Sequence, residues 1–206
     1  MFATAEVRWF FPGPLPGAVR AWFEGRGNRL AYQAPRRDRY LGLPDDSLGV
    51  KLREGRLEIK LRRQKGEFLR LHPQVTGILE RWQKWSFPLQ EAAAALPGIA
   101  VGDSGWLAVE KHRGVTRYRV AGDEPPVAVA PDVYPVQGCE VEMVELYAGG
   151  RAWWSLCFEA FGQERALPQG LLATARQFLG GAEPPHLEAG SSYGYPRWLA
   201  GLAALT

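Results

Sequence analysis

Residues 48–62 read LGVKLREGRLEIKLR, two short segments in which apolar and charged residues alternate. Alternation with a period of two is typical of a strand that has one buried face. Glu54-Gly55 lies between the segments and suits a two-residue turn. This turn fixes the register, in which the expected cross-strand pairs are Arg53–Arg56, Leu52–Leu57, Lys51–Glu58 and Val50–Ile59. The stretch therefore predicts a β-hairpin.

One face of this hairpin is strongly basic. It carries Lys51, Arg53, Arg56, Lys60 and Arg62, with only Glu58 to offset them. Like charges crowded on one face of a sheet repel each other. Either water screens these side chains on a solvated face, or an anion binds to them. The function of the protein depends on which of the two is true.

The composition narrows the class of protein. The chain has 206 residues, 46% of them hydrophobic, which is enough for a sizeable core. The net charge of +3 argues against bulk electrostatic coating of nucleic acid. The basic stretch 51–70 leaves RNA contact as a third possibility, but the regular strand alternation explains that stretch better. We expect one domain spanning residues 1–206.

Two further features concern the compartment. No apolar run approaches the roughly 20 residues of a membrane span, so we expect a soluble, cytoplasmic protein with no membrane contact. Cys139 and Cys157 have no metal-binding spacing, and two thiols do not form a disulfide framework. We expect both cysteines to be free and buried.

The rest of the chain alternates between further hairpins and short helices. Hairpins are predicted at residues 106–121 around Arg113-Gly114 and at residues 139–161 around Gly149-Gly150. The expected helices span residues 15–24, 73–85, 89–96 and 171–179, with a last one from residue 196. Hairpins separated by helices predict an α+β fold, an antiparallel β-barrel decorated with helices.

An acidic face complements the basic one. In the hairpin at residues 139–161, Glu140 is opposite Glu159 and shares a face with Glu142. These carboxylates repel each other unless cations hold them. The candidate cations are the basic strands or a divalent metal, and oxygen-only ligands suit Mg²⁺ or Mn²⁺. On an open sheet these charges would face solvent, whereas in a closed barrel they would line a tunnel.

Several segments, in order, resemble the CYTH domain of the triphosphate tunnel metalloenzyme superfamily. They are Tyr40-Leu41, residues 48–53, Leu57-Glu58-Ile59-Lys60, Val109 to Arg113, Cys139 to Met143, and Ser192-Tyr193 before Trp198-Leu199. The family's first strand reads E-x-E-x-K, whereas this chain has Glu6, Arg8 and Phe10 at those positions. The resemblance implies an eight-stranded antiparallel tunnel-like barrel, basic on one side and acidic on another.

The resemblance also implies site residues. The candidates for phosphate binding are Lys51, Arg53, Lys60, Arg62, Lys111 and Arg113. The candidates for metal binding are Glu140, Glu142 and Glu6, with Mg²⁺ or Mn²⁺ as the cofactor if the protein is catalytic. No catalytic residue is assigned, because none of the common hydrolase or nucleotide motifs occurs.

Two functions follow. In the first, the protein binds a triphosphate or another small phosphorylated anion and hydrolyses it with a divalent metal. In the second, the same interior is a non-catalytic module that binds an anion or nucleotide. Arg8 favours the second function, because it replaces a carboxylate with a cation where the resemblance implies a metal site.

Overall fold

The computed structural model describes residues 1–26, 31–64, 66–95, 105–181 and 183–203. Its strands are β1 (Phe2–Pro12), β2 (Ala31–Tyr32), β3 (Arg36–Leu41), β4 (Leu48–Arg53), β5 (Arg56–Arg62), β6 (Glu67–His72), β7 (Val75–Pro88), β8 (Trp106–Arg119), β9 (Val127–Ala128), β10 (Gly138–Ala148) and β11 (Arg151–Phe161). Its α-helices are α1 (Gly17–Glu24), α2 (Leu89–Ala95), α3 (Leu167–Leu179) and α4 (Tyr195–Ala203). Short 3₁₀ turns span Glu164–Ala166 and Ala189–Ser191.

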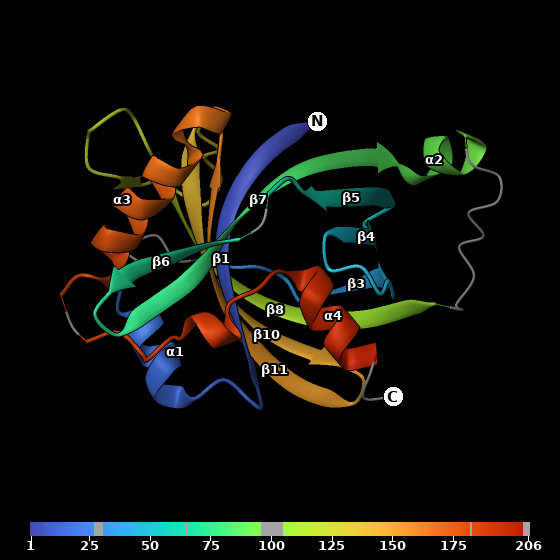
Figure 1. Ribbon diagram of the computed structural model, residues 1–206, viewed down its shortest axis with the longest axis horizontal. Coiled ribbons are helices and arrows are strands. Elements are labelled where there is room, and N and C mark those ends of the chain that lie inside the picture. The colour runs from blue at the N-terminus through green and yellow to red at the C-terminus, as the bar shows by residue number, and fades with distance from the viewer. Residues whose placement is uncertain (27–30, 65, 96–104, 182, 204–206) are drawn as a thin grey trace.

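Eight of the strands close into an antiparallel barrel. The hydrogen-bonded order is β1-β11-β10-β8-β3-β4-β5-β7, and β7 pairs back to β1. β6 pairs with β7 outside this circuit, and β2 and β9 pair with β8. Figure 1 shows β1 crossing the middle of the molecule between the β10–β11 hairpin and β7. Because these eight strands form a closed circuit, their alternating side chains point either into the barrel or outward.

The main hydrophobic core lies on the outer face of the barrel. Outward side chains of β1, β10 and β11, including Val7, Val141 and Leu156, are fully buried there. They belong to one cluster with Leu171 and Phe178 of α3, whose apolar side covers this wall (Figure 1). The barrel wall is therefore apolar on the outside where α3 packs, which leaves its inner face for polar residues.

Helix α4 packs against the inner face near one end of the barrel. Trp198, Leu199 and Leu202 are buried against inward residues of β1, β3, β8 and β10, among them Phe10 and Tyr40. The Phe10 and Trp198 rings stack with centroids 5.0 Å apart. This end of the interior is therefore filled by an apolar floor, which we define as α4 and the side chains that it contacts.

The segment before α4 approaches the barrel wall closely at Gly194. A Cβ atom at this position would lie 2.7 Å from Glu80 Oε2 and 2.8 Å from Trp82 Cζ2. Contacts this short exclude any side chain, so only glycine fits here. The chain thus passes directly over Glu80 before α4 begins.

The predicted fold class and two hairpins are confirmed. The β4–β5 register pairs Lys51 with Glu58 and Val50 with Ile59, as expected. The β10–β11 register pairs Glu140 with Glu159, also as expected. The helices predicted at residues 15–24, 89–96, 171–179 and from 196 correspond to α1, α2, α3 and α4, although Leu96 lies outside the described residues. Cys139 and Cys157 are both buried and free.

The helix predicted at residues 73–85 is wrong, because this segment forms β7. Val75 and Leu79 point outward into the core, whereas Trp82 lies on the opposite, inward face with Glu80. An aromatic residue on the polar face made the apolar spacing resemble that of a helix. Pairing with β1, β5 and β6 overrides the local pattern.

The hairpin predicted around Arg113-Gly114 is also wrong. β8 runs without a turn from Trp106 to Arg119 and pairs with β10 over eleven positions. Gly114 lies within the strand, opposite Met143. Arg113 therefore points into the barrel instead of occupying a turn. No helix in the described part of the chain is long and apolar enough to cross a membrane.

Candidate functional site

Ion pairs that pass over an intervening strand identify the interior. Arg8 of β1 contacts Glu142 of β10, although β11 lies between these strands. Lys60 of β5 contacts Glu6 of β1 over β7 in the same way. Side chains can meet across a strand only on the concave side of the sheet, so these residues face the barrel interior. The registers place the other charged residues discussed below on the same face.

Among the described residues, ten basic side chains on this inner face pair with seven carboxylates. The basic residues are Arg8, Arg36, Lys51, Arg53, Lys60, Arg62, Lys84, Lys111, Arg113 and Arg117. The carboxylates are Glu6, Asp38, Glu58, Glu80, Glu140, Glu142 and Glu159. These ion-paired cations thus outnumber the carboxylates by three, and Arg56, which the register places on the same face, donates to Ser86 Oγ instead.

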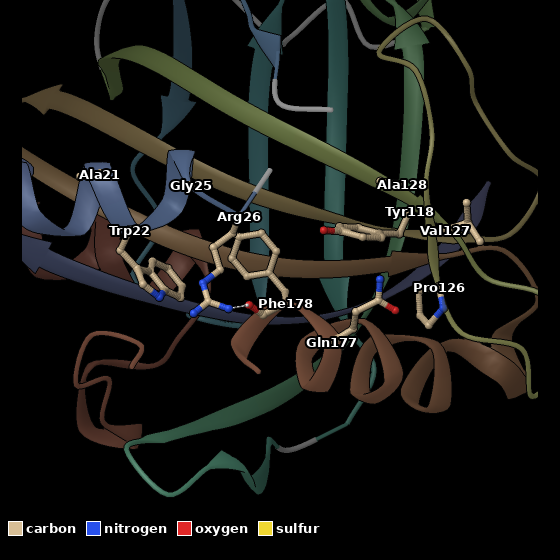
Figure 2. A pocket seen from close by; sticks show the side chains of 10 residues that line it. All are labelled: Ala21, Trp22, Gly25, Arg26, Tyr118, Pro126, Val127, Ala128, Gln177 and Phe178. Carbon is tan, nitrogen blue, oxygen red and sulfur yellow. Dashed lines mark hydrogen bonds between the residues drawn. The ribbon is translucent and has the colours of Figure 1, made fainter. Parts of the chain in front are cut away.

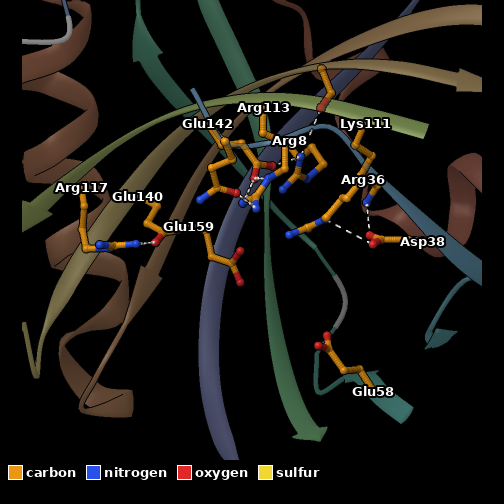
Figure 3. Close-up of polar contacts among 12 residues, drawn as sticks. Arg8, Arg36, Asp38, Glu58, Lys111, Arg113, Arg117, Glu140, Glu142 and Glu159 are labelled. Atoms are coloured by element: carbon orange, nitrogen blue, oxygen red, sulfur yellow. Dashed lines mark hydrogen bonds and ion pairs between the residues drawn. The ribbon is translucent and has the colours of Figure 1, made fainter. Parts of the chain in front are cut away.

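The surplus is concentrated in three triads, each with one carboxylate between two basic side chains. In the first triad, Glu142 lies between Arg8 and Arg113, with Arg8 Nη1 donating to Glu142 Oε1 at 2.9 Å (Figure 3). Arg8 also donates to Ser155 Oγ at 3.1 Å. Burial alone would raise the pKa of Glu142, but Arg113 and Arg8 hold it far below its usual value. This carboxylate is therefore ionised, and each of its two oxygens contacts an arginine.

The second triad is centred on Asp38, which is completely buried. Lys111 Nζ lies 3.0 Å from Asp38 Oδ2, and Arg36 Nε lies 3.2 Å from Oδ1. Lys111 also donates to the hydroxyl of Tyr40 and lies 4.0 Å from the centre of the Tyr195 ring of α4. Figure 3 shows Arg36 with its Nε toward Asp38 and the rest of its guanidinium directed away from that carboxylate.

The third triad joins the two strands of the first predicted hairpin. Glu58 Oε2 lies 2.9 Å from Lys51 Nζ, and Glu58 Oε1 lies 2.6 Å from Arg53 Nη2. The side chains of Lys51 and Arg53 keep 21% and 30% of their surface exposed. Water, and hence a small ion, reaches this triad, whereas Arg8 and Lys111 at 5% and 4% are shielded.

The remaining carboxylates each have one basic partner from the strands. The pairs are Lys60–Glu6, Arg62–Glu80, Lys84–Glu159 and Arg117–Glu140. Asp46, in the loop before β4, adds a second and more exposed carboxylate to Arg62. This part of the inner face is therefore close to neutral, and the surplus positive charge lies toward β8, β3, β4 and β5.

The lysines of two triads have lowered pKa values, chiefly because they are buried. Burial lowers the pKa of Lys51 to about 8, and Arg53 adds to the shift although Glu58 opposes it. Burial also lowers the pKa of Lys111 well below its usual value, with Lys51 adding to that shift. An additional anion near these ammonium groups would reverse part of this cost.

The predicted metal ligands do not form a shared metal site. Glu142 is held by two arginines, Glu6 by Lys60 and Glu140 by Arg117. No group of three or more histidine, cysteine or acidic side chains within the described ranges could hold a metal ion. Mg²⁺ needs several oxygen ligands in a near-octahedral arrangement. The residues present therefore do not fit the Mg²⁺ or Mn²⁺ that the family resemblance implies.

The predicted phosphate-binding residues all lie on the inner face, in different surroundings. Lys51 and Arg53 share a triad, and Arg113 belongs to the Glu142 triad. Lys60 and Arg62 are bound to Glu6 and Glu80, and Lys111 is covered by Tyr195 of α4.

Sequence reasoning missed several members of the inner face, namely Arg36, Asp38, Glu80, Lys84 and Arg117. A period-two reading of Glu80, Trp82, Lys84 and Ser86 would have placed two of them. Arg36 and Asp38 also alternate along β3 with residues of the outer face, but no sequence motif marks them as site residues.

A separate groove of ≈ 920 Å³ lies on the outside, between α1, α3 and residues 126–128 (Figure 2). Trp22 and Phe178 line it, and Arg26 donates to the carbonyl oxygen of Phe178. No sequence-predicted site residue borders this groove, so it is unrelated to the charged interior.

Comparisons with known proteins do not identify a family for this chain. No protein-family model matches the chain, and no curated protein matches it. Among solved structures, the fold is similar to the crystal structure of a putative adenylate cyclase from Bacillus halodurans. The match has a TM-score of 0.34 and 13% sequence identity, and covers 87% of this chain and 94% of that chain. A similarity this low carries no argument about the site or the activity.

Proposed function

We propose that the barrel interior binds a small phosphorylated anion, such as a triphosphate, through the basic side chains of the triads. The observation that carries the proposal is the 10-to-7 ratio of basic to acidic side chains among the ion-paired residues of the inner face, with the three surplus cations of this set in triads. Guanidinium and ammonium groups match phosphate oxygens in charge and geometry. The proposal assigns no catalytic residue and concerns binding alone.

The surplus of positive charge on the inner face also favours a ligand with several phosphates. The triads follow one another along neighbouring strands, β10 and β8, then β3, then β4 and β5. A single phosphate could reach one triad, whereas a chain of phosphates could neutralise more than one. We expect affinity to rise from phosphate to diphosphate to inorganic tripolyphosphate, because each further charged contact contributes favourable free energy.

Calorimetric titration of the three anions in chelator tests this proposal. The expected result is saturable binding of tripolyphosphate that weakens as sodium chloride is added, because salt screens the interaction. The same titration in Mg²⁺ shows whether a metal is needed. An absence of tripolyphosphate binding in both buffers would rule out the proposed function.

Anion binding should also depend on pH through Lys51. Its ammonium has a pKa lowered to about 8 by burial, so it loses its proton as the pH rises through that value. Tripolyphosphate affinity should therefore decrease between pH 7 and pH 9 relative to the Lys51→Arg variant, whose guanidinium stays protonated. Comparing the two proteins at each pH cancels the ionisation of the ligand itself. Parallel pH profiles would show that Lys51 does not contact the anion.

The folded protein alone should show the opposite pH dependence of stability. A lysine with a folded pKa below its unfolded value of 10.5 binds fewer protons when folded. Its contribution destabilises the fold below about pH 8, and this destabilisation disappears as the pH rises toward the unfolded value. In urea unfolding without ligand, Lys51→Arg should remove this dependence between pH 8 and pH 10.

A further inference from the structure

We infer that the anion site works without a divalent metal, because Arg8 supplies the cation that neutralises Glu142 and Arg36 supplies a direct ligand contact. This inference rests on the proposed function, gives Arg8 a specific partner and assigns a role to Arg36, for which the sequence predicted none.

Arg8 is locked in place around Glu142. Its guanidinium donates to Glu142 and Ser155 and lies 4.9 Å from the centre of the Tyr195 ring. The side chain is 5% exposed, so a ligand cannot displace it easily. A metal ion at Glu142 would have to remove both Arg8 and Arg113 from that carboxylate. Arg8 is thus a positioning residue, a permanent cation that occupies the carboxylate of Glu142.

Arg36 and Arg53 each have a hydrogen-bond donor that is not used. The Nε atoms of both side chains are buried and have no hydrogen-bond partner of suitable geometry among the described residues. Arg36 Nε is near Asp38 Oδ1, but that oxygen is unmatched as well. Buried donors without partners are rare in folded proteins and call for an explanation. The side chains of Arg36 and Arg53 are 20% and 30% exposed, so an anion in the barrel interior can approach them.

The effect of Mg²⁺ on ligand affinity distinguishes a metal-dependent site from a metal-free one. In a metal-dependent site, Mg²⁺ bridges protein carboxylates and ligand phosphates, so it strengthens binding. In the site inferred here, the basic side chains bind the negatively charged phosphates directly, without a bridging metal. Mg²⁺ that binds tripolyphosphate lowers this charge, so it should weaken binding. The two mechanisms therefore predict opposite signs for the same titration.

The decisive experiment titrates inorganic tripolyphosphate into the wild-type protein in chelator and again in excess Mg²⁺. The expected result is binding in chelator that becomes weaker in Mg²⁺. Binding only in Mg²⁺, or markedly tighter binding there, overturns this inference while the proposed function stands. Electron paramagnetic resonance with Mn²⁺ alone gives an independent check: stoichiometric Mn²⁺ binding that Glu142→Gln abolishes also overturns the inference.

The role of Arg36 is tested by Arg36→Gln, with Arg37→Gln as the matched control. Arg37 is the next residue on β3, is exposed and lies on the outer face. In chelator, Arg36→Gln should weaken tripolyphosphate binding about tenfold or more, the loss of one charge-assisted contact. Arg37→Gln should change it little, although both variants lose one positive charge. Equal effects of the two substitutions would show that only the overall charge matters and would remove Arg36 from the site.

Discussion

Replacing Glu142 by glutamine should lower the free energy of unfolding by about 3–5 kcal/mol, because the change leaves buried positive charge without a counter-charge. Glu142 is the only carboxylate among the described residues that contacts both Arg8 and Arg113, and Arg8 is almost completely shielded from water. Urea unfolding of the purified variant measures the loss. The shape of the side chain is kept, so the effect reports charge and not a cavity.

Glu145 on the same strand provides the control. It faces outward, pairs with Arg20, and both partners are more than a third exposed. Glu145→Gln should cost at most about 1 kcal/mol, the usual range for an exposed pair. If the two substitutions cost the same, Glu142 is not the buried counter-ion described above. In chelator, Glu142→Gln should also strengthen tripolyphosphate binding, whereas removal of a metal ligand would weaken binding measured in Mg²⁺.

The double variant Lys51→Gln with Arg53→Gln should weaken tripolyphosphate binding by about 100-fold or more, the loss of two charge-assisted contacts. These side chains are the most accessible pair of cations in any triad. Calorimetry in chelator measures the change, and circular dichroism confirms that the variant is folded. The remaining Glu58 would lie in the site without a partner and add repulsion.

Two further variants make this second prediction specific. Arg37→Gln with Arg63→Gln removes two exposed arginines, so it changes the net charge equally but leaves the interior intact. This control should keep most of the affinity. Glu58→Gln should strengthen binding, because it frees Lys51 and Arg53. If Glu58→Gln instead weakens binding, the carboxylate takes part in binding and the account of the triad is wrong.

Two of the three hairpins predicted from alternating segments around a short turn are confirmed, whereas the third, around Arg113-Gly114, is a continuous stretch of β8. For β4–β5 and β10–β11, the turn and the alternation together left only one register that buried the apolar side. β7 had no such turn that sequence reasoning recognised, and Trp82 on its polar face imitated a helical spacing. Lys60 lies 4.4 Å from the centre of the Trp82 ring, so this aromatic residue belongs to the charged interior. Local apolar spacing cannot distinguish such a residue from a core residue.

The charged residues were predictable as members of a face, but their partners were not. Lys51, Arg53 and Glu58 meet across one hairpin, so their triad follows from the register. Arg8 and Glu142 are 134 positions apart and meet only because β1, β11 and β10 are neighbours. From sequence, Arg8 was a departure from a metal-binding pattern. Closure of the barrel shows that it is the counter-ion of one of the predicted metal ligands.

The apolar floor under the charged interior has a consequence for how the protein folds. Arg8 stands near the start of the chain, whereas Tyr195, which covers both Arg8 and Lys111, belongs to α4. During synthesis, the inner face of β1 is therefore complete only after the rest of the barrel and α4 have formed. A nascent chain that lacks α4 exposes Phe10 and Tyr40 to water beside crowded like charges. We therefore expect the interior to be completed late in folding, after α4 has docked.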